Sequence, residues 1–225
     1  MLRLFSLTRW KTIMEKTCAI LSGGAFSPLA GIEDHTALVI ACDKGYAYAK
    51  RAGIKPDLFV GDFDSLIEKV DADVPVLELP CEKDDTDTMA AVRYAVEKGY
   101  THLRIYCALG GRLDHMLGNL QAAVFAVEHG ACVEIVDDLD FVYVRGGGSL
   151  TLPAKAGYSL SLLSLTDECR GVSVRGVKYP LENATLTNAF PIGVSNEWRG
   201  DAEIAFESGV LAVICSLMAR GTEEG

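Results

Sequence analysis

Apolar and polar positions over roughly the first 140 residues follow two alternating patterns. Short runs rich in aliphatic and β-branched residues predict strands, and longer runs with apolar residues three and four positions apart predict helices. Strands that alternate with helices in this way indicate βαβ units and a mainly parallel sheet. The predicted strands are 17–24, 37–43, 57–65, 74–80, 103–111, 132–138 and 141–146, and the predicted helices are 45–53, 86–99 and 114–130.

The pattern changes after the glycine-rich segment 145–149. The rest of the chain consists of short alternating runs separated by turns, and none of them has the spacing of an amphipathic helix. Such alternation is typical of an antiparallel sandwich or barrel. We therefore predict an α/β protein with an extension over 1–16, a mainly parallel α/β domain over 17–145 and an antiparallel β-sandwich over 146–225.

Composition and charge narrow the class of function. The 225 residues carry a net charge of −10, so non-specific binding to nucleic acid or to an anionic membrane is not expected. An acidic protein that binds a phosphate substrate usually needs a cation between the two. The seven cysteines are odd in number and form no C-x-x-C pair. This usage predicts reduced thiols in a cytoplasmic protein rather than disulfides or structural zinc.

The opening segment, MLRLFSLTRWKTIMEK, is basic and has no acidic residue before Glu15. Two interpretations stay open. The segment is either a weak amphipathic targeting peptide or an extension before a packed chain that begins near Met14. No apolar run in the sequence approaches the ~18 residues that a membrane helix needs.

Charged side chains follow four of the predicted strands. In an open parallel sheet, ligands bind at the carboxyl ends of the strands. Because these ends share one edge of the sheet, we expect the charged residues to meet there. They are Asp43 after the second strand, Asp62 and Asp64 after the third, Lys83, Asp84, Asp85 and Asp87 after the fourth, and Arg112, Asp114 and His115 after the fifth.

The segment GDFDS places two carboxylates on one side of an extended chain. Asp62 and Asp64 would repel one another there unless a cation lies between them. Mg²⁺ prefers oxygen ligands and commonly binds one or two carboxylates together with phosphate oxygens. The alternative is a solvated turn of the Asp-x-Asp kind.

The segment EKDDTDT comes at the start of the second predicted helix. Asp84 and Asp87 are three residues apart and share a helical face if the helix begins here. Helix capping by Asp84 or Asp85 is an alternative, because the dipole favours acids at a helix N-terminus by about 0.3–1 kcal/mol. Capping needs fewer acids than three, which favours a function. Lys83 and Thr86 are candidate phosphate contacts.

The segment GGRLDHMLGN combines a flexible turn with polar side chains at the start of the third predicted helix. Its two glycines allow the backbone to approach a ligand closely, and Arg112 can bind phosphate oxygens with two donors. His115 and Asn119 are four residues apart and share one face of the helix. The alternative is a glycine turn in which Asp114 caps the helix and His115 is partly buried in the core.

In the second half of the chain, the segment GVSNEW places Ser195 and Asn196 before Trp198. An aromatic face can stack on a heteroaromatic ring, more favourably on a cationic one. The alternative is a tryptophan packed in the core of the sandwich. The chain has no G-x-G-x-x-G and no Walker A motif, which argues against a dinucleotide oxidoreductase and a P-loop kinase.

From about Thr17 onward the chain resembles the thiamine pyrophosphokinase family. GDFDS, KDDTDT, GGRLDHMLGNL and SNEW occur in that family's order and at its approximate spacing. The resemblance implies a nucleotide-binding catalytic domain over 17–145 and a thiamine-binding sandwich over 146–225. It further implies a homodimer that binds thiamine near the subunit interface. The reaction would be attack of the thiamine hydroxyl on the β-phosphorus of ATP, with AMP as leaving group.

The resemblance also implies roles for the candidate residues. Asp62, Asp64, Asp84 and Asp87 would bind Mg²⁺, and Lys83, Thr86 and Arg112 would contact phosphate. Asp43, Asp85, Asp114, His115 and Asn119 would complete the nucleotide pocket, and Ser195, Asn196 and Trp198 would bind thiamine. The catalytic residues would be Asp62, Asp64, Asp87, Lys83 and Arg112.

Two rival functions remain open at this point. One is a Mg²⁺-dependent phospho- or diphosphotransferase that acts on another small alcohol, which would share the nucleotide end of the site. The other is a non-catalytic sensor that binds ATP and Mg²⁺. So many metal-ligating residues favour an enzyme over a sensor.

Overall fold

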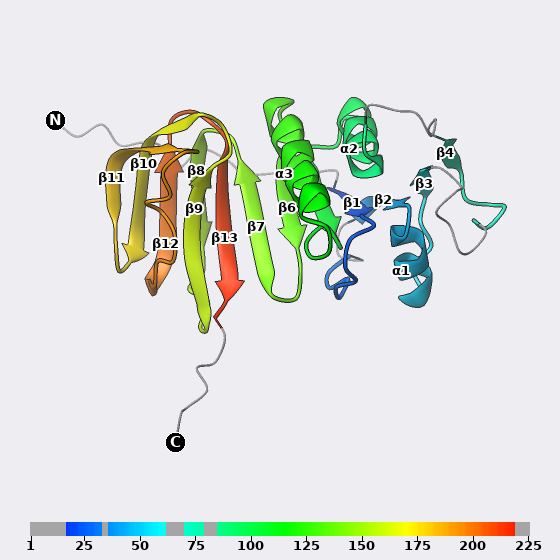
Figure 1. Cartoon of the computed structure of the whole chain (residues 1–225), viewed down its shortest axis with the longest axis horizontal. Helices are drawn as coiled ribbons and strands as arrows, with labels where there is room; N and C mark the ends of the chain where they lie inside the picture. The colour runs from blue at the N-terminus through cyan, green and yellow to red at the C-terminus, as the bar shows by residue number, and fades with distance from the viewer. Residues whose placement is uncertain (1–16, 33–35, 62–69, 79–84, 219–225) are drawn as a thin grey trace, which may run out of the picture.

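The computed structural model describes residues 17–32, 36–61, 70–78 and 85–218. Within these residues the chain forms a nine-stranded sheet and a four-stranded sheet. Figure 1 shows the helices over one part of the large sheet and the small sheet packed against the other part. The predicted fold class, a mainly parallel α/β part followed by an antiparallel β-sandwich, is confirmed.

The large sheet has the strand order β4-β3-β2-β1-β5-β6-β7-β13-β9. The pairings from β4 to β6 are all parallel, and those from β6 to β9 are all antiparallel. The parallel strands are β1 (Thr17–Leu21), β2 (Thr36–Cys42), β3 (Leu58–Gly61), β4 (Val76–Glu78), β5 (His102–Tyr106) and β6 (Cys132–Val136). The others are β7 (Asp140–Arg145), β9 (Tyr158–Ser164) and β13 (Leu211–Leu217).

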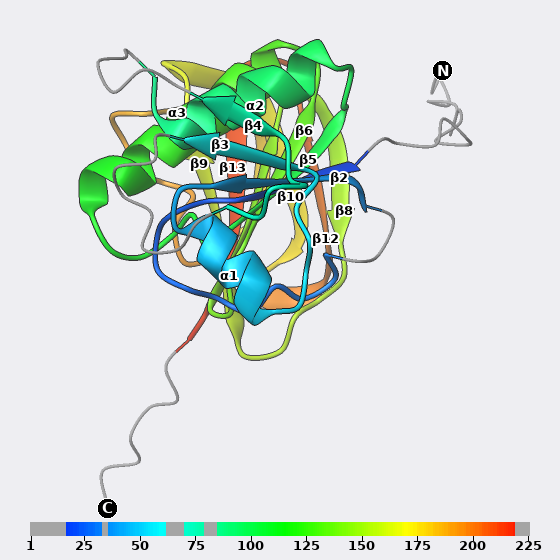
Figure 2. The ribbon, with the colours of Figure 1, turned by 90° about the vertical axis from the view of Figure 1, so that its right-hand side faces the viewer.

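Helices cover both faces of the parallel part of this sheet. Helix α1 (Gly45–Arg51) lies on one face, and α2 (Asp87–Glu97) and α3 (Leu113–Glu128) lie together on the other, as Figure 2 shows. Helix α2 begins where Thr86 accepts a hydrogen bond from the Met89 N–H at 3.2 Å. The predicted capping by Asp84 or Asp85 is therefore wrong, because the extended residue with a capping side chain is Thr86. Asp114 does not cap α3 either, since it lies in the first turn and Arg112 occupies the cap position.

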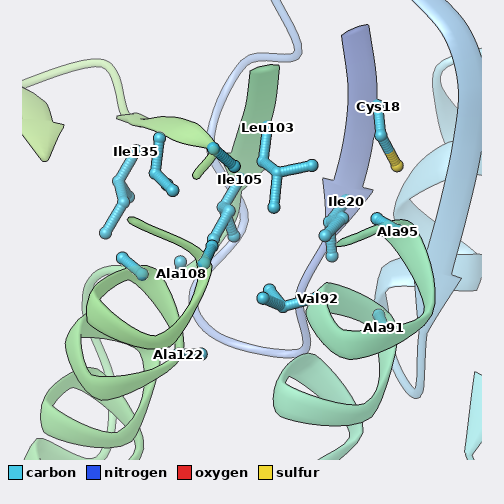
Figure 3. Packing of buried hydrophobic residues seen from close by; sticks show 14 of the residues in the cluster. Cys18, Ile20, Ala91, Val92, Ala95, Leu103, Ile105, Ala108, Ala122 and Ile135 are labelled. Carbon is cyan, nitrogen blue, oxygen red and sulfur yellow. The ribbon is translucent and has the colours of Figure 1, made fainter. Parts of the chain in front are cut away.

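Small residues on α2 and α3 allow both helices to approach the sheet closely. Ala91, Ala95 and Ala122 face the larger side chains of Ile20 and Ile105 in the centre of the sheet, as Figure 3 shows. All five residues are completely buried. Burial of such side chains is the main favourable contribution to folding, about 25 cal/mol per Å² of apolar surface. The strands that carry the predicted site are therefore fixed from both faces.

The sandwich is built from the four-stranded sheet and from the antiparallel end of the large sheet. Leu160, Leu162 and Val213 of the large sheet pack in one apolar cluster with Val174 and Ile204 of the small sheet. Strands β9 and β13 follow the predicted boundary at residue 146 but belong to the same sheet as β1. The division into two domains thus stays a prediction, since one sheet crosses it. The small sheet has the order β11 (Leu181–Thr187), β10 (Glu168–Val177), β12 (Trp198–Phe206) and β8 (Gly148–Leu152).

Candidate functional site

The strand order changes direction between β1 and β5. Strand β1 leads to β2 on one side, whereas β5 pairs with β1 on its other side. Such a switch point leaves an opening at the carboxyl ends of the strands, where open α/β sheets bind ligands. The Ser22 N–H donates to the Tyr106 carbonyl and the Gly24 N–H to the Cys107 carbonyl, both at 2.9 Å. The loops after β1 and β5 are thereby joined at this edge, which we call the carboxyl rim.

Asp43 lies at the carboxyl rim with a strained backbone. Its φ angle is +47°, in the left-handed region that non-glycine residues seldom adopt. The Asp43 N–H donates to the Val60 carbonyl at 3.3 Å. The side chain lies against Gly23, where a Cβ atom would stand 3.1 Å from Asp43 Oδ2. This backbone conformation places the Asp43 carboxylate beside the loop that follows β1.

The first turn of α2 reaches the same place. The thiol of Cys42, the last residue of β2, donates to the Asp87 carbonyl at 3.6 Å. One residue further on, Thr88 Oγ1 lies 2.7 Å from Ser22 Oγ. The backbone of Asp87 is therefore held between the ends of β1 and β2, and its partner Cys42 directly precedes Asp43. The α2 N-terminus also carries positive dipole charge toward this edge, which favours anions.

Asp85 and Thr86 lie at the start of α2 with protein partners of their own. The Asp85 carboxylate is 3.0 Å from an Arg93 guanidinium nitrogen and is about one-third exposed. The Thr86 hydroxyl oxygen accepts the helix-capping hydrogen bond from the Met89 N–H. In this arrangement the Thr86 hydroxyl proton remains available to a ligand, since the cap uses only a lone pair.

The loop between β5 and α3 turns through two glycines. Gly110 and Gly111 have φ angles of +75° and +84°, which only glycine adopts without strain. Arg112 and Asp114 follow, both well exposed, with 2.6 Å between Nη2 and Oδ2. The hydrogen bond from Arg112 lowers the pKa of Asp114. Arg112 is an exposed cation with a long side chain at the rim. An anionic ligand would compete with Asp114 for its guanidinium group.

His115 and Asn119 have different environments although they share a helical face. His115 is exposed, so the alternative of a partly buried core histidine is wrong. Asn119 is only 5% exposed, and its Nδ2 donates to the Ala108 carbonyl at 2.8 Å. The Asn119 amide therefore anchors the start of the β5–α3 loop, a contact with the protein rather than with solvent.

Four predicted site residues lie outside the described residues: Asp62, Asp64, Lys83 and Asp84. Of the four predicted metal ligands, the structure thus describes Asp87 alone. Across the described ranges no group of three or more histidine, cysteine or acidic residues is placed to hold a metal ion. The carboxylate of Asp43 at the rim and that of Asp87 in the first turn of α2 are nevertheless hard oxygen donors, which is the chemistry that Mg²⁺ requires.

The predicted thiamine residues lie on a segment that pairs with β9, at the outer edge of the large sheet. The Asn196 N–H donates to the Leu160 carbonyl at 2.8 Å, and the Leu162 N–H donates to the Gly193 carbonyl at 2.8 Å. A Cβ atom on Gly193 would lie 2.3 Å from the Leu162 carbonyl oxygen. Glycine is therefore required there for the segment to lie so close to β9.

Asn196 and Ser195 are tied to the protein. Asn196 is 6% exposed, and its amide accepts from the Tyr179 N–H at 2.9 Å and donates to the Tyr179 carbonyl at 2.7 Å. Ser195 has a φ angle of +61° and donates its N–H to Ser161 Oγ at 3.0 Å. The Ser195 side chain is exposed. Of these two residues, only Ser195 is exposed to solvent.

Trp198 lies at the beginning of β12 and combines two environments. Its ring is half-buried at the margin of the sandwich core, on the same side of the strand as Ala202 and Ile204. Its indole Nε1 is buried without a hydrogen-bond partner in the part of the chain that the structure describes. The Trp198 side chain thus combines packing in the core with a buried donor that no described residue satisfies.

The two groups of candidate residues lie along one edge of the molecule but far apart. A single row of paired residues, Leu21, Tyr106, Val136, Phe141, Cys215 and Leu160, crosses the sheet and ends beside Asn196. From β1 to β9 this row spans five strand spacings in the order β1-β5-β6-β7-β13-β9, about 24 Å at about 4.8 Å each. Figure 1 shows the sandwich and the α1 end of the sheet on opposite sides of the molecule.

Sequence reasoning did not select Ser22 and Thr88, although both line the rim. The only signal for Ser22 is its place in SGG after a predicted strand, which indicates a weak phosphate-loop candidate. The sequence around Thr88 does not predict its role, because the hydroxyl group that it contacts is 66 residues away in sequence. Contacts of this kind depend on the packing of α2 over β1.

The fold and the rim define an open α/β protein with a candidate ligand site at a sheet switch point, joined to an antiparallel sandwich. Two family descriptions match the chain: "Thiamin pyrophosphokinase, catalytic domain" over residues 30–135 and "Thiamin pyrophosphokinase, vitamin B1 binding domain" over residues 149–211. The chain belongs to the thiamin pyrophosphokinase family.

Individual relatives agree with this assignment. A thiamine pyrophosphokinase from Bacillus subtilis (strain 168) is 30% identical over 211 residues, which cover 89% of this chain and 99% of that protein. A crystal structure of the Bacillus subtilis enzyme has a TM-score of 0.80 to this chain, at 31% identity, and covers 89% of this chain and 99% of its own. A thiamin pyrophosphokinase structure from Geobacillus thermodenitrificans has a TM-score of 0.76, at 27% identity, with coverages of 92% and 99%.

No helix among the described residues has both the length and the apolar character that crossing a membrane requires.

Proposed function

We propose that this chain transfers the diphosphoryl group of ATP to the hydroxyl group of thiamine, which yields thiamine diphosphate and AMP. The family assignment over both halves of the chain carries this proposal. The rim supports it, because Asp43, Asp87 and the α2 N-terminus converge where two loops leave the sheet. Transfer of a phosphoryl group depends mainly on positioning and on charge neutralisation, which such a rim can supply.

Mg²⁺ is the proposed cofactor, bound by Asp62, Asp64, Asp84 and Asp87. The ion would neutralise the charge that develops on the polyphosphate as the bond to AMP breaks. Asp43 supports the assignment, because its left-handed backbone places its carboxylate beside Gly23, in the loop that follows β1. An overall charge of −10 favours such an intermediary cation for ATP binding.

The nucleotide would be bound by the residues of the rim. Lys83, Thr86 and Arg112 are proposed phosphate contacts, and Arg112 would exchange its contact with Asp114 for phosphate oxygens. Asp85 and His115 would contact the nucleotide from the starts of α2 and α3. We propose that Asn119 contributes indirectly, since its amide anchors Ala108.

Thiamine is proposed to bind at Ser195 and Trp198, with its ring stacked on the indole of Trp198. Trp198 Nε1 supports this role, because it is a buried donor without a partner among the described residues, which is costly unless another group completes it. Asn196 would shape this end of the site through its two hydrogen bonds to Tyr179.

The separation of these two groups supports the proposal that the protein is a homodimer. Strands β1 and β9 are about 24 Å apart across the sheet, which exceeds the reach of one thiamine molecule between Trp198 and the rim. We propose that Trp198 of one subunit serves the rim of the other. The exposed apolar side chains near this segment, Phe190, Ile192 and Val194, support an interface there.

The cytoplasm is the proposed location. Cys18, Cys107, Cys132, Cys169 and Cys215 are free thiols, and all of these except Cys132 are buried. Burial raises the pKa of Cys107 and keeps this thiol protonated and unreactive next to the rim. Reduced cysteines of this kind are typical of a reducing compartment.

The test is incubation of the purified protein with ATP, Mg²⁺ and thiamine, followed by chromatography of the nucleotides and thiamine esters. We expect AMP and thiamine diphosphate in equal amounts, and neither product when Mg²⁺ is chelated. Formation of ADP with thiamine monophosphate would identify an ordinary kinase instead. AMP formed with another alcohol but not with thiamine would identify a different diphosphotransferase.

A further inference from the structure

Two buried hydroxyl groups join the end of β1 to the first turn of α2. Ser22 Oγ and Thr88 Oγ1 lie 2.7 Å apart, and the residues are 3% and 5% exposed. Ser22 follows the last residue of β1, and Thr88 follows Asp87 in α2. Each hydroxyl can donate one hydrogen bond and accept others, so the pair satisfies both groups where water has little access.

The contacts around this pair fix the backbone of Asp87 from two directions. At the end of β2, the Cys42 thiol donates to the Asp87 carbonyl with a sulfur–oxygen distance of 3.6 Å. At the end of β1, Ser22 holds the next residue, Thr88, by the hydrogen bond between their hydroxyl groups. Next to Ser22, Gly23 lies against the Asp43 carboxylate. One hydrogen bond thus sets the position of the first turn of α2 relative to the loop that carries Ser22 and Gly23.

We propose that Ser22 and Thr88 are positioning residues of the diphosphoryl-transfer site. Neither side chain touches a substrate in this role. Their hydrogen bond places the Asp87 carboxylate at the distance from the β1 loop that Mg²⁺–ATP requires. The inference rests on the metal role proposed for Asp87. Errors of about 1 Å in such placement can reduce turnover by as much as about a hundredfold, so a hydrogen bond outside the site affects the chemistry.

A purely structural role makes a different prediction, and a double variant separates the two. Removal of one hydroxyl leaves the other buried without a partner, which destabilises the fold. Removal of both, in Ser22→Ala/Thr88→Val, leaves no unpaired group and nearly conserves volume, so stability returns toward wild type. If the pair only stabilises the fold, activity returns with stability. If it positions Asp87, activity stays low.

The experiment compares Thr88→Val, Ser22→Ala, the double variant and Thr88→Ser, each as the full chain. The readouts are kcat, the KM for thiamine, the thermal unfolding midpoint and the Kd of Mg²⁺ with α,β-methylene-ATP by calorimetry. This analogue is not cleaved at the bond that the reaction breaks. Ser164→Ala is the matched control, because Ser164 is a buried sandwich residue whose hydroxyl donates to the Thr166 carbonyl at 2.7 Å.

For Thr88→Val and for the double variant we expect kcat to fall about tenfold and the analogue Kd to rise about tenfold. The KM for thiamine should change by less than about twofold, since neither hydroxyl touches thiamine in this role. Thr88→Ser should retain wild-type values because it keeps the hydroxyl. Ser164→Ala should lower the unfolding midpoint without changing kcat or the analogue Kd.

Recovery of both kcat and the analogue Kd in the double variant would overturn the inference, as would an effect of Ser164→Ala equal to that of Thr88→Val. Failure of the underlying proposal has a different signature. If Asp87→Ala binds Mg²⁺ and the analogue as wild type does, the metal role of Asp87 is wrong whatever Thr88→Val does. If Asp87→Ala loses binding and Thr88→Val does not, only the positioning role is wrong.

Discussion

At the scale of single residues, local backbone conformation positions the acids of the candidate site. Asp43 has a left-handed backbone, and Asp87 is the first residue of α2, directly after the capping residue Thr86. The sequence predicted both as rim residues, because each follows a strand or begins a helix. It did not predict that Asn119 and Asn196 turn their amides toward backbone carbonyls. Amide direction depends on partners from distant segments, which local spacing does not specify.

Replacement of Asp87 tests the rim at this scale. We expect Asp87→Ala to lower kcat by at least about a hundredfold, because an electrostatic contact to the transition state is lost. The loss of an acid from the first turn of α2 should cost at most about 1 kcal/mol of stability. Steady-state kinetics and urea unfolding measure the two effects. Asp73→Ala, which removes an exposed acid paired with Lys55 before β4, is the control and should leave kcat unchanged. Wild-type turnover in Asp87→Ala would remove this residue from the site.

At the scale of elements, an ion network joins three neighbouring strands in the middle of the large sheet. Glu134 of β6 lies 3.2 Å from His102 Nε2 and 3.1 Å from Arg104 Nε, both of β5. Arg145 of β7 approaches it to 3.3 Å. Burial by itself raises the pKa of Glu134, but the hydrogen bond and charge of His102 and the charges of both arginines lower it to about 2.

This network predicts the pH dependence of stability. A carboxyl group whose folded pKa lies below its unfolded value stabilises the fold above the unfolded pKa, here 4.5. The contribution is lost as the pH falls through about 2. We expect Glu134→Gln to be less stable than wild type at pH 7 by on the order of 2–3 kcal/mol. The difference should shrink steadily below pH 4.5.

Urea unfolding at several pH values measures this difference, with the exposed Glu97→Gln as control. A difference between Glu134→Gln and wild type that stays constant from pH 7 to pH 3 would show that the charge of Glu134 does not contribute.

At the scale of the whole molecule, the large sheet connects the two groups of candidate residues and also separates them. The register carries Leu21 and Leu160 along one row, so both groups lie at the same edge. Their separation of about 24 Å supports the proposal that Trp198 completes the thiamine site of the partner subunit rather than that of its own chain. The alternating patterns predicted both halves of the fold. They did not predict that β9 and β13 extend the parallel sheet.

A shared site predicts complementation between two inactive variants. Asp87→Ala and Trp198→Ala, mixed in equal amounts and allowed to exchange subunits, should form heterodimers as half of all dimers. Each heterodimer has one intact site, so activity should reach about a quarter of that of wild type. The assay uses thiamine below the KM of Trp198→Ala, and light scattering confirms the dimer.

Each variant incubated alone is the control and should stay inactive at that thiamine concentration. Absence of restored activity in a mixture that light scattering shows to be dimeric would place the whole site within one subunit.

The sequence by itself determined which segments form strands and helices and which charged residues stand at strand ends. These features depend on periodicity and on neighbours along the chain. The segments EKDDTDT and GGRLDHMLGN are examples, because their charged residues are close together in the sequence. Tertiary structure alone decided the hydroxyl pair of Ser22 and Thr88, the inward amides and the distance between rim and tryptophan. These depend on how sheet and helices bury their apolar faces against each other, which is a property of the whole chain.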